Sequence, residues 1–124
     1  MKDPTRRLLA YIVLRLASAQ PFFALQDHAA ARVFHIDADI PPTKTRIAVL
    51  DRGLGCLLKG VGGGGFYTLT NGEAGKPISL KLKESQFEGF DYSSGKPYNG
   101  TVAGNSITIH DAETAKEFRY TASF

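Results

Sequence analysis

The sequence predicts an α+β fold, with two N-terminal helices and then an antiparallel β-meander of about seven or eight strands, barrel-like or strongly curved. Three observations indicate this class. Apolar residues recur at helical spacing as far as residue 33, and they alternate with polar residues from residue 34 onward. A turn pattern also returns at Asn71, Asp91 and Asp111, in steps of 20 residues. The 124 residues suit one domain, 1–124, with one core.

The first predicted helix begins near Thr5, which caps it or lies in its first turn, and it ends before Pro21. Its polar residues form a narrow stripe, which consists of Arg7, Tyr11, Arg15 and Ser18. Its apolar face is wide and consists of Leu8, Leu9, Ile12, Val13 and Leu16. A helix of this kind is expected to be largely buried, either on the β region or in an oligomer. Residues 8–16 are therefore a candidate homodimer surface.

The same segment also fits a secretory signal peptide, because basic residues precede the apolar run and Ala17-Ser18-Ala19 resembles a cleavage site. Arg15 argues against cleavage, since it limits the uninterrupted apolar run to Leu8–Leu14. A retained helix favours a cytoplasmic protein. Removal of residues 1–19 would instead place the protein in the periplasm or outside the cell. The run is too short to predict a membrane span.

The second helix is predicted over residues 22–33, where Phe22, Leu25, Ala29 and Val33 share helical spacing. A half-buried strand should follow from Phe34 to Ile40, and Pro41-Pro42 should end it. The prediction thus divides the domain into a helical part (1–33), a strand and linker (34–43) and a β-meander (44–124).

The 20-residue pattern predicts successive β-hairpins in the meander. Asn71, Asp91 and Asp111 each open a turn, and a Lys follows five residues later. Asp and Asn side chains accept hydrogen bonds from their own turns, which is why they favour this position. One step back along the chain lies Asp51, which also follows an apolar run. The predicted strands alternate apolar and polar residues, as expected for a sheet with one wet face.

One cluster suits metal chemistry. His35, Asp37 and Asp39 would project from one strand face about 6.5–7 Å apart, and one imidazole with two carboxylates suits a divalent cation. The matching hypothesis is a metal-dependent hydrolase or lyase, with His110 as acid or base and His28 as a possible further ligand. The simpler interpretation is a solvated strand face. No other cofactor is indicated.

Aromatic and basic residues are interleaved between residues 66 and 98, which is a pattern of single-stranded nucleic-acid binders. The net charge is only +3, and acidic residues lie in the same stretch, so the composition argues against a nucleic-acid partner. The simpler interpretation is that most of these aromatic residues belong to the core.

No catalytic set emerges from the remaining polar residues, most of which the turn pattern explains. The sequence therefore favours a non-enzymatic binding module that recognises a protein or small ligand through a sheet face or through its turns, 71–76, 91–96 and 111–116. Tyr92, Tyr98 and Lys96 are the predicted contact residues, because the two tyrosines flank a turn and are expected to be exposed there.

Overall fold

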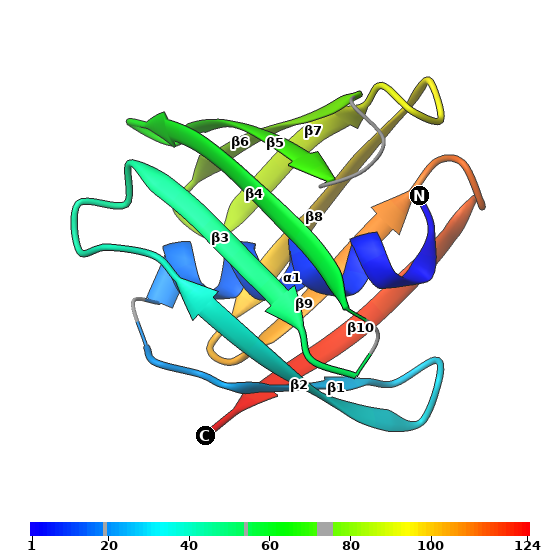
Figure 1. Ribbon diagram of the computed structural model, residues 1–124. Coiled ribbons are helices and arrows are strands. Elements are labelled where there is room, and N and C mark those ends of the chain that lie inside the picture. Colours follow the sequence, from blue (N-terminus) through cyan, green and yellow to red (C-terminus); the bar gives the residue numbers. More distant parts are fainter. Residues whose placement is uncertain (19, 54, 72–75) are drawn as a thin grey trace.

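The computed structural model describes residues 1–18, 20–53, 55–71 and 76–124, and in these residues the chain forms one helix and ten strands (Figure 1). The helix α1 spans Asp3–Ser18. The strands are β1 (Ala24–Asp27), β2 (Arg32–Asp39), β3 (Arg46–Asp51), β4 (Cys56–Gly63), β5 (Phe66–Asn71), β6 (Pro77–Lys83), β7 (Gln86–Asp91), β8 (Lys96–Ala103), β9 (Ser106–Asp111) and β10 (Lys116–Ser123).

The ten strands form a closed antiparallel barrel. Each strand pairs with its neighbours along the chain, and β1 closes the sheet by pairing with β10, where Leu25 lies opposite Ala122. Closure removes the free edges of the sheet, which are otherwise sites of aggregation. The predicted α+β class with a barrel-like meander is confirmed.

Helix α1 runs through the inside of the barrel (Figure 1). Residues 8–14 have no exposed surface, and α1 contacts strands on several sides of the wall, namely β1, β3, β4, β8, β9 and β10. The inward residues of the strands form the other half of the core. Because the barrel surrounds α1, most of the helix surface is apolar and only a narrow polar stripe remains.

This arrangement covers the apolar surface that led us to expect a homodimer. Residues 8–14 and Leu16 are buried within a single chain, so they offer no surface to a second copy. Homodimerisation itself stays a prediction. Among the described residues, the only helix is too short and too polar to cross a membrane.

The predicted helix over residues 22–33 is wrong. This segment forms β1, a turn and the start of β2, because β1 is needed to join β2 to β10. The turn is held by Asp27, whose Oδ1 accepts hydrogen bonds from the N–H groups of Ala29 (3.0 Å) and Ala30 (3.1 Å). Long-range pairing therefore outweighs the helical propensity of the alanines. Eight strands, β3–β10, lie within the predicted meander of residues 44–124, and β2 corresponds to the strand predicted from Phe34 to Ile40, so β1 is the strand that was missed.

The predicted hairpin turns lie together at one end of the barrel. Odd-numbered strands all run the same way in an antiparallel meander, and they finish at Asp27, Asp51, Asn71, Asp91 and Asp111. We refer to this end as the Asx end. In the turn after Asp91, the N–H of Ser93 donates to Oδ1 (3.0 Å) and the N–H of Gly95 to the main-chain carbonyl of Asp91 (2.9 Å). Most of the predicted turn at 71–76 lies outside the described residues.

Candidate functional site

The last residue of each odd-numbered strand at the Asx end points into the barrel. Strand side chains alternate between the two faces, so Asp51 shares the inward face of Ile47 and Val49, just as Asp111 shares that of Ile109. Four of these residues are carboxylates with at most 5% of their surface exposed, namely Asp27, Asp51, Asp91 and Asp111. Buried carboxylates are stable only with hydrogen bonds or cations, which makes this end chemically distinct.

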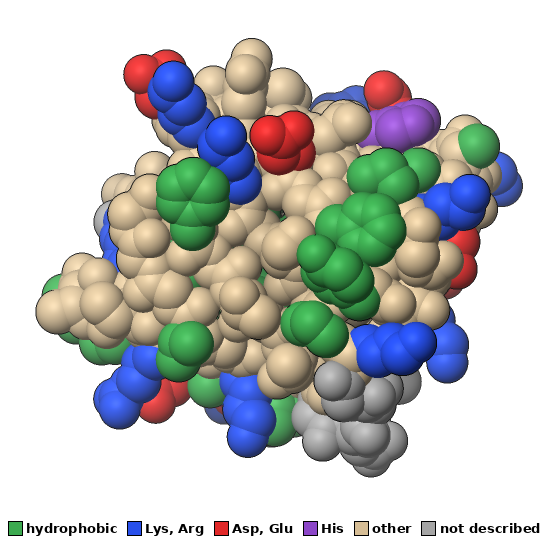
Figure 2. Space-filling model, turned by 90° about the horizontal axis from the view of Figure 1, so that it is seen from above, with side chains coloured by type: hydrophobic (Ala, Val, Ile, Leu, Met, Phe, Trp, Pro, Cys, Tyr) green, Lys and Arg blue, Asp and Glu red, His purple; other side chains and the backbone are tan. Residues whose placement is uncertain are grey.

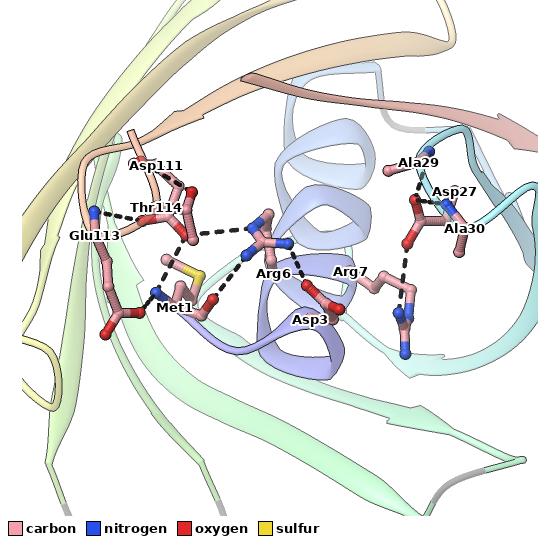
Figure 3. Close-up of polar contacts among 10 residues, drawn as sticks. All are labelled: Met1, Asp3, Arg6, Arg7, Asp27, Ala29, Ala30, Asp111, Glu113 and Thr114. Atoms are coloured by element: carbon pink, nitrogen blue, oxygen red, sulfur yellow. Dashed lines mark hydrogen bonds and ion pairs between the residues drawn. The ribbon is translucent and has the colours of Figure 1, made fainter. Parts of the chain in front are cut away.

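Arg6 supplies the cation for Asp111 (Figure 3). Its Nε lies 3.3 Å from Asp111 Oδ2, and its terminal nitrogens donate to Asp3 Oδ1 and to the Met1 carbonyl, both at 2.7 Å. The guanidinium also stacks 3.5 Å from the ring centre of Phe118. Burial by itself would lower the pKa of Arg6, but the hydrogen bond to Asp3 and nearby negative groups raise it, so the group stays charged.

Arg7 does the same for Asp27 on another side of the helix. Its Nη1 lies 3.3 Å from Asp27 Oδ2 (Figure 3), and its guanidinium lies 3.8 Å from the ring centre of Phe34. In both hairpins the aromatic residue follows the aspartate by seven positions. Each arginine is therefore held between a carboxylate and a ring from one hairpin, and the two contacts fix the start of α1 against β1–β2 and β9–β10.

The beginning of the chain adds positive charge to the same end. The amino group of Met1 pairs with Asp111 (3.1 Å) and with Glu113. The N-terminus of α1 also carries a partial positive charge, because its first N–H groups have no partners within the helix. Helix and barrel thus attract each other electrostatically at the Asx end.

Asp91 is buried to the same extent but lacks such a partner. The N–H of Ser93 donates to its Oδ1, and no cation of the described residues lies within 4.0 Å of the carboxylate. Beside it lies a pocket of about 180 Å³. Polar residues of the turns and of the helix start line most of this pocket, among them Lys2, Thr5, Asn71, Lys76, Ser93 and Ser94.

Two of the three predicted contact residues lie where the sequence suggested. Tyr92 is 52% exposed in the turn after β7, with its ring packed edge-on against Phe90 at 4.8 Å. Lys96 is exposed at the start of β8. Both lie at the Asx end, one on each side of the turn that carries Ser93 and Ser94.

The expected exposure of Tyr98 is wrong, because only 1% of its surface is accessible. It occupies an inward position of β8, where its ring covers Gly89 and leaves no room for a Cβ on that residue. Its hydroxyl donates to the Ser79 carbonyl at 2.5 Å. Burial, with the charge of Asp91, raises the pKa of Tyr98.

The candidate metal ligands share the outer face of β2, as predicted from alternation. His35 and Asp39 are exposed, and Asp37 pairs with Arg52 at 2.7 Å, which lowers the pKa of Asp37. Across the described part of the chain, no three His, Cys, Asp or Glu residues form a group able to hold a metal ion. His28 contacts Thr121 instead, and His110 lies on β9.

The aromatic stretch at 66–98 divides between core and surface. Tyr67, Phe87 and Tyr98 are buried, whereas Phe66 is 61% exposed, with Lys81 Nζ 5.6 Å from its ring centre. Figure 2 shows the face seen from above, where hydrophobic side chains gather in separate places among lysines, arginines and acidic residues. A hollow of about 470 Å³ lies on the outer wall of the barrel beside Phe66 and Lys81.

Sequence reasoning missed the residues that organise the Asx end. Arg6, Arg7, Asp27 and Asp111 were not singled out as partners, although a signal for them exists. The aspartate of each repeat continues the inward alternation of the strand before it, so its side chain had to enter the core, where a carboxylate needs a cation or hydrogen-bond donors.

Together these features define a class: a small closed β-barrel filled by its own N-terminal helix, with a polar pocket at one end. Comparison with known protein families, with characterised proteins and with solved structures finds no match to this chain.

Proposed function

We propose that this protein is a non-enzymatic binding module whose recognition site is the Asx end. The observation that carries the proposal is the pocket beside Asp91, to which all three repeat turns contribute: Asn71 and Lys76, then Asp91, Ser93 and Ser94, then Glu113. Binding sites are typically concave and carry a few polar groups that fix the orientation of a ligand. Exposed Tyr92 and Lys96, beside this pocket, extend the surface for a larger partner.

The filled interior supports this choice of site. Hollow barrels bind ligands inside, but here α1 occupies the space and its residues 8–14 have no exposed surface. Recognition is therefore assigned to the outside of the barrel or to its ends. The Asx end is favoured over the outer wall because it combines a concave shape with buried charge.

The proposal is tested by recording amide NMR shifts of the ¹⁵N-labelled protein against a library of small polar fragments. Shifts are expected to concentrate at Lys76, Ser93, Ser94 and Glu113. Hits that map instead to the hollow beside Phe66, or no hit at millimolar concentrations, would overturn the proposal.

A matched pair of variants sharpens the test. Ser93→Phe places a large side chain at the pocket, two residues after Asp91, and should abolish the fragment shifts. Ala29→Phe makes a comparable change two residues after Asp27, in an exposed turn outside the pocket lining, and should leave them intact. Equal loss of binding in both variants would contradict the assignment of the site.

A further inference from the structure

We infer that the pocket beside Asp91 binds a small zwitterion of the amino-acid class, with its ammonium group on Asp91 and its carboxylate on Lys2 and Lys76. The inference rests on the recognition site proposed above and names its ligand.

The first argument is that, among the described residues, only Oδ1 of the Asp91 carboxylate accepts a hydrogen bond. At Asp27 and Asp111, Oδ1 holds the turn and Oδ2 meets an arginine of α1. At Asp91, Oδ1 holds the turn in the same way, but no cation of the described chain lies within 4.0 Å of the carboxylate. A carboxylate that is 95% buried, with 5% of its surface exposed, needs a charged or hydrogen-bonding partner. An ammonium group in the pocket would take the place that the arginines take elsewhere.

The second argument is the charge of two other residues that line the pocket, Lys2 and Lys76. Lys2 and Lys76 are exposed residues of this pocket, and neither forms an ion pair among the residues described. Their ammonium groups suit a carboxylate of the ligand. The hydroxyls of Thr5, Ser93 and Ser94 can accept hydrogen bonds from an ammonium group or donate them to a carboxylate. A molecule with both charges matches the pocket better than a simple amine or a simple acid.

Size and charge favour a small ligand. The pocket volume of about 180 Å³ is enough for a small amino acid, since one water molecule takes up about 30 Å³ in the liquid. A metal ion is disfavoured, because the two lysines repel it and no described group of three ligands is present.

The inference is tested by titrating the full chain with four probes: glycine, L-alanine, ethylamine and propionate. Glycine and alanine should shift the amides of Lys76, Ser93 and Ser94 and raise the melting temperature. Ethylamine and propionate should bind at least about tenfold more weakly, since each lacks one of the two charged contacts.

The decisive variant is Asp91→Asn. An asparagine keeps the oxygen that accepts the Ser93 N–H, and Asn71 already occupies the equivalent position, so the barrel should fold. Binding of glycine and alanine should weaken by roughly tenfold to a hundredfold, the range of one charged hydrogen bond. Asp39→Asn, the same change at the exposed end of β2, should have no effect.

The outcomes separate the two proposals. If none of the four probes binds, or if Asp91→Asn binds them as well as the unaltered chain, the zwitterion assignment is wrong. If the fragment screen still locates hits at the three turns in that case, the recognition site stands without it. If neither probes nor fragments contact these turns, both proposals fail.

Discussion

Two sides of the Asx end carry the same local structure for different purposes. At Asp27 and Asp111, a buried carboxylate meets an arginine of α1 and a phenylalanine seven residues further along the chain. At Asp91, the equivalent carboxylate meets no arginine, and the seventh residue is Tyr98. The turn hydrogen bonds are alike on both sides, so the difference comes from contact with the helix. We call the side of Asp27 and Asp111 the closed side, and the side of Asp91, which borders the pocket, the open side. One repeated hairpin thus serves both folding and the proposed recognition.

Removal of residues 1–19 is the largest test of the closed side. It deletes Arg6, Arg7 and the part of the apolar core that the helix supplies, including Leu8, Leu9, Ile12 and Leu14. At about 1.5–3 kcal/mol for each large buried side chain, the loss is as large as the total stability of about 5–15 kcal/mol that is typical of a domain. Circular dichroism and amide NMR of a chain that starts at Gln20 should therefore show no folded barrel. A cooperative native-like fold in that chain would contradict the role assigned to α1.

Breaking one ion pair is the next largest test. Arg6→Met should lower the free energy of unfolding by about 3–5 kcal/mol, because it removes a buried guanidinium and leaves the Asp111 carboxylate with only the Met1 amino group as an ion-pair partner among the described residues. The double variant Arg6→Met/Asp111→Asn should recover part of this loss, since no charge is then stranded. Urea denaturation of the two single variants and the double variant measures the coupling. An additive result would mean that the pair contributes nothing to the closed side.

Two tyrosines near Asp91 differ in burial, because Tyr98 lies inside the barrel and Tyr92 lies on the surface. Substituting each of them compares these two positions. Tyr98→Ala should lower the free energy of unfolding by about 3–5 kcal/mol, because it removes a large buried ring and the hydrogen bond to Ser79. Tyr92→Ala removes a ring that is half exposed and should change stability by less than about 1 kcal/mol. Thermal unfolding of both variants checks the difference, and similar melting temperatures would show that Tyr98 is not part of the core.

Much of this fold could be predicted from sequence, because turn chemistry and alternation are local signals. The Asx residues located the turns, and the alternating strands indicated a curved antiparallel sheet. The closing strand β1 could not be read in this way, since its four residues gain their structure from pairing with β2 and β10. Helical spacing over such a short segment is ambiguous.

The candidate site was predictable only in part, for a related reason. Turn position predicted exposed Tyr92 and Lys96, but Tyr98 lies on the inward register of β8, and one step along a strand changes the face. The pocket lies beside Asp91, whereas the arginines of α1 reach Asp27 and Asp111. Which aspartates meet these arginines depends on how α1 sits in the barrel, and no local pattern of the strands records it.

Alkaline unfolding should report on buried tyrosines at both sides. Burial raises the pKa of Tyr120 to about 12, with nearby Arg6 opposing part of the rise, and burial raises the pKa of Tyr98 as well. The unfolded chain loses these protons near pH 10, so it binds fewer protons than the folded chain above that pH, and stability must fall. For Tyr120 the loss should reach about 3 kcal/mol between roughly pH 10 and 12. Tyr120→Phe should make the decline shallower, and an unchanged slope would contradict this origin.

The smallest expected effect on stability concerns the turn residue that lies four positions after each aspartate, where glycine and alanine are exchanged for one another. Four residues after Asp91 lies Gly95 with φ +70°, and four residues after Asp111 lies Ala115 with φ +55°. Side chains disfavour this left-handed region, so Gly95→Ala should lower stability by about 1 kcal/mol and Ala115→Gly should raise it by up to about 1 kcal/mol. Neither residue lines the pocket beside Asp91, so glycine and alanine binding should stay the same in both variants. Opposite stability changes with unchanged binding would show that the two turns share one geometry, and that the difference between the two sides comes from the helix alone.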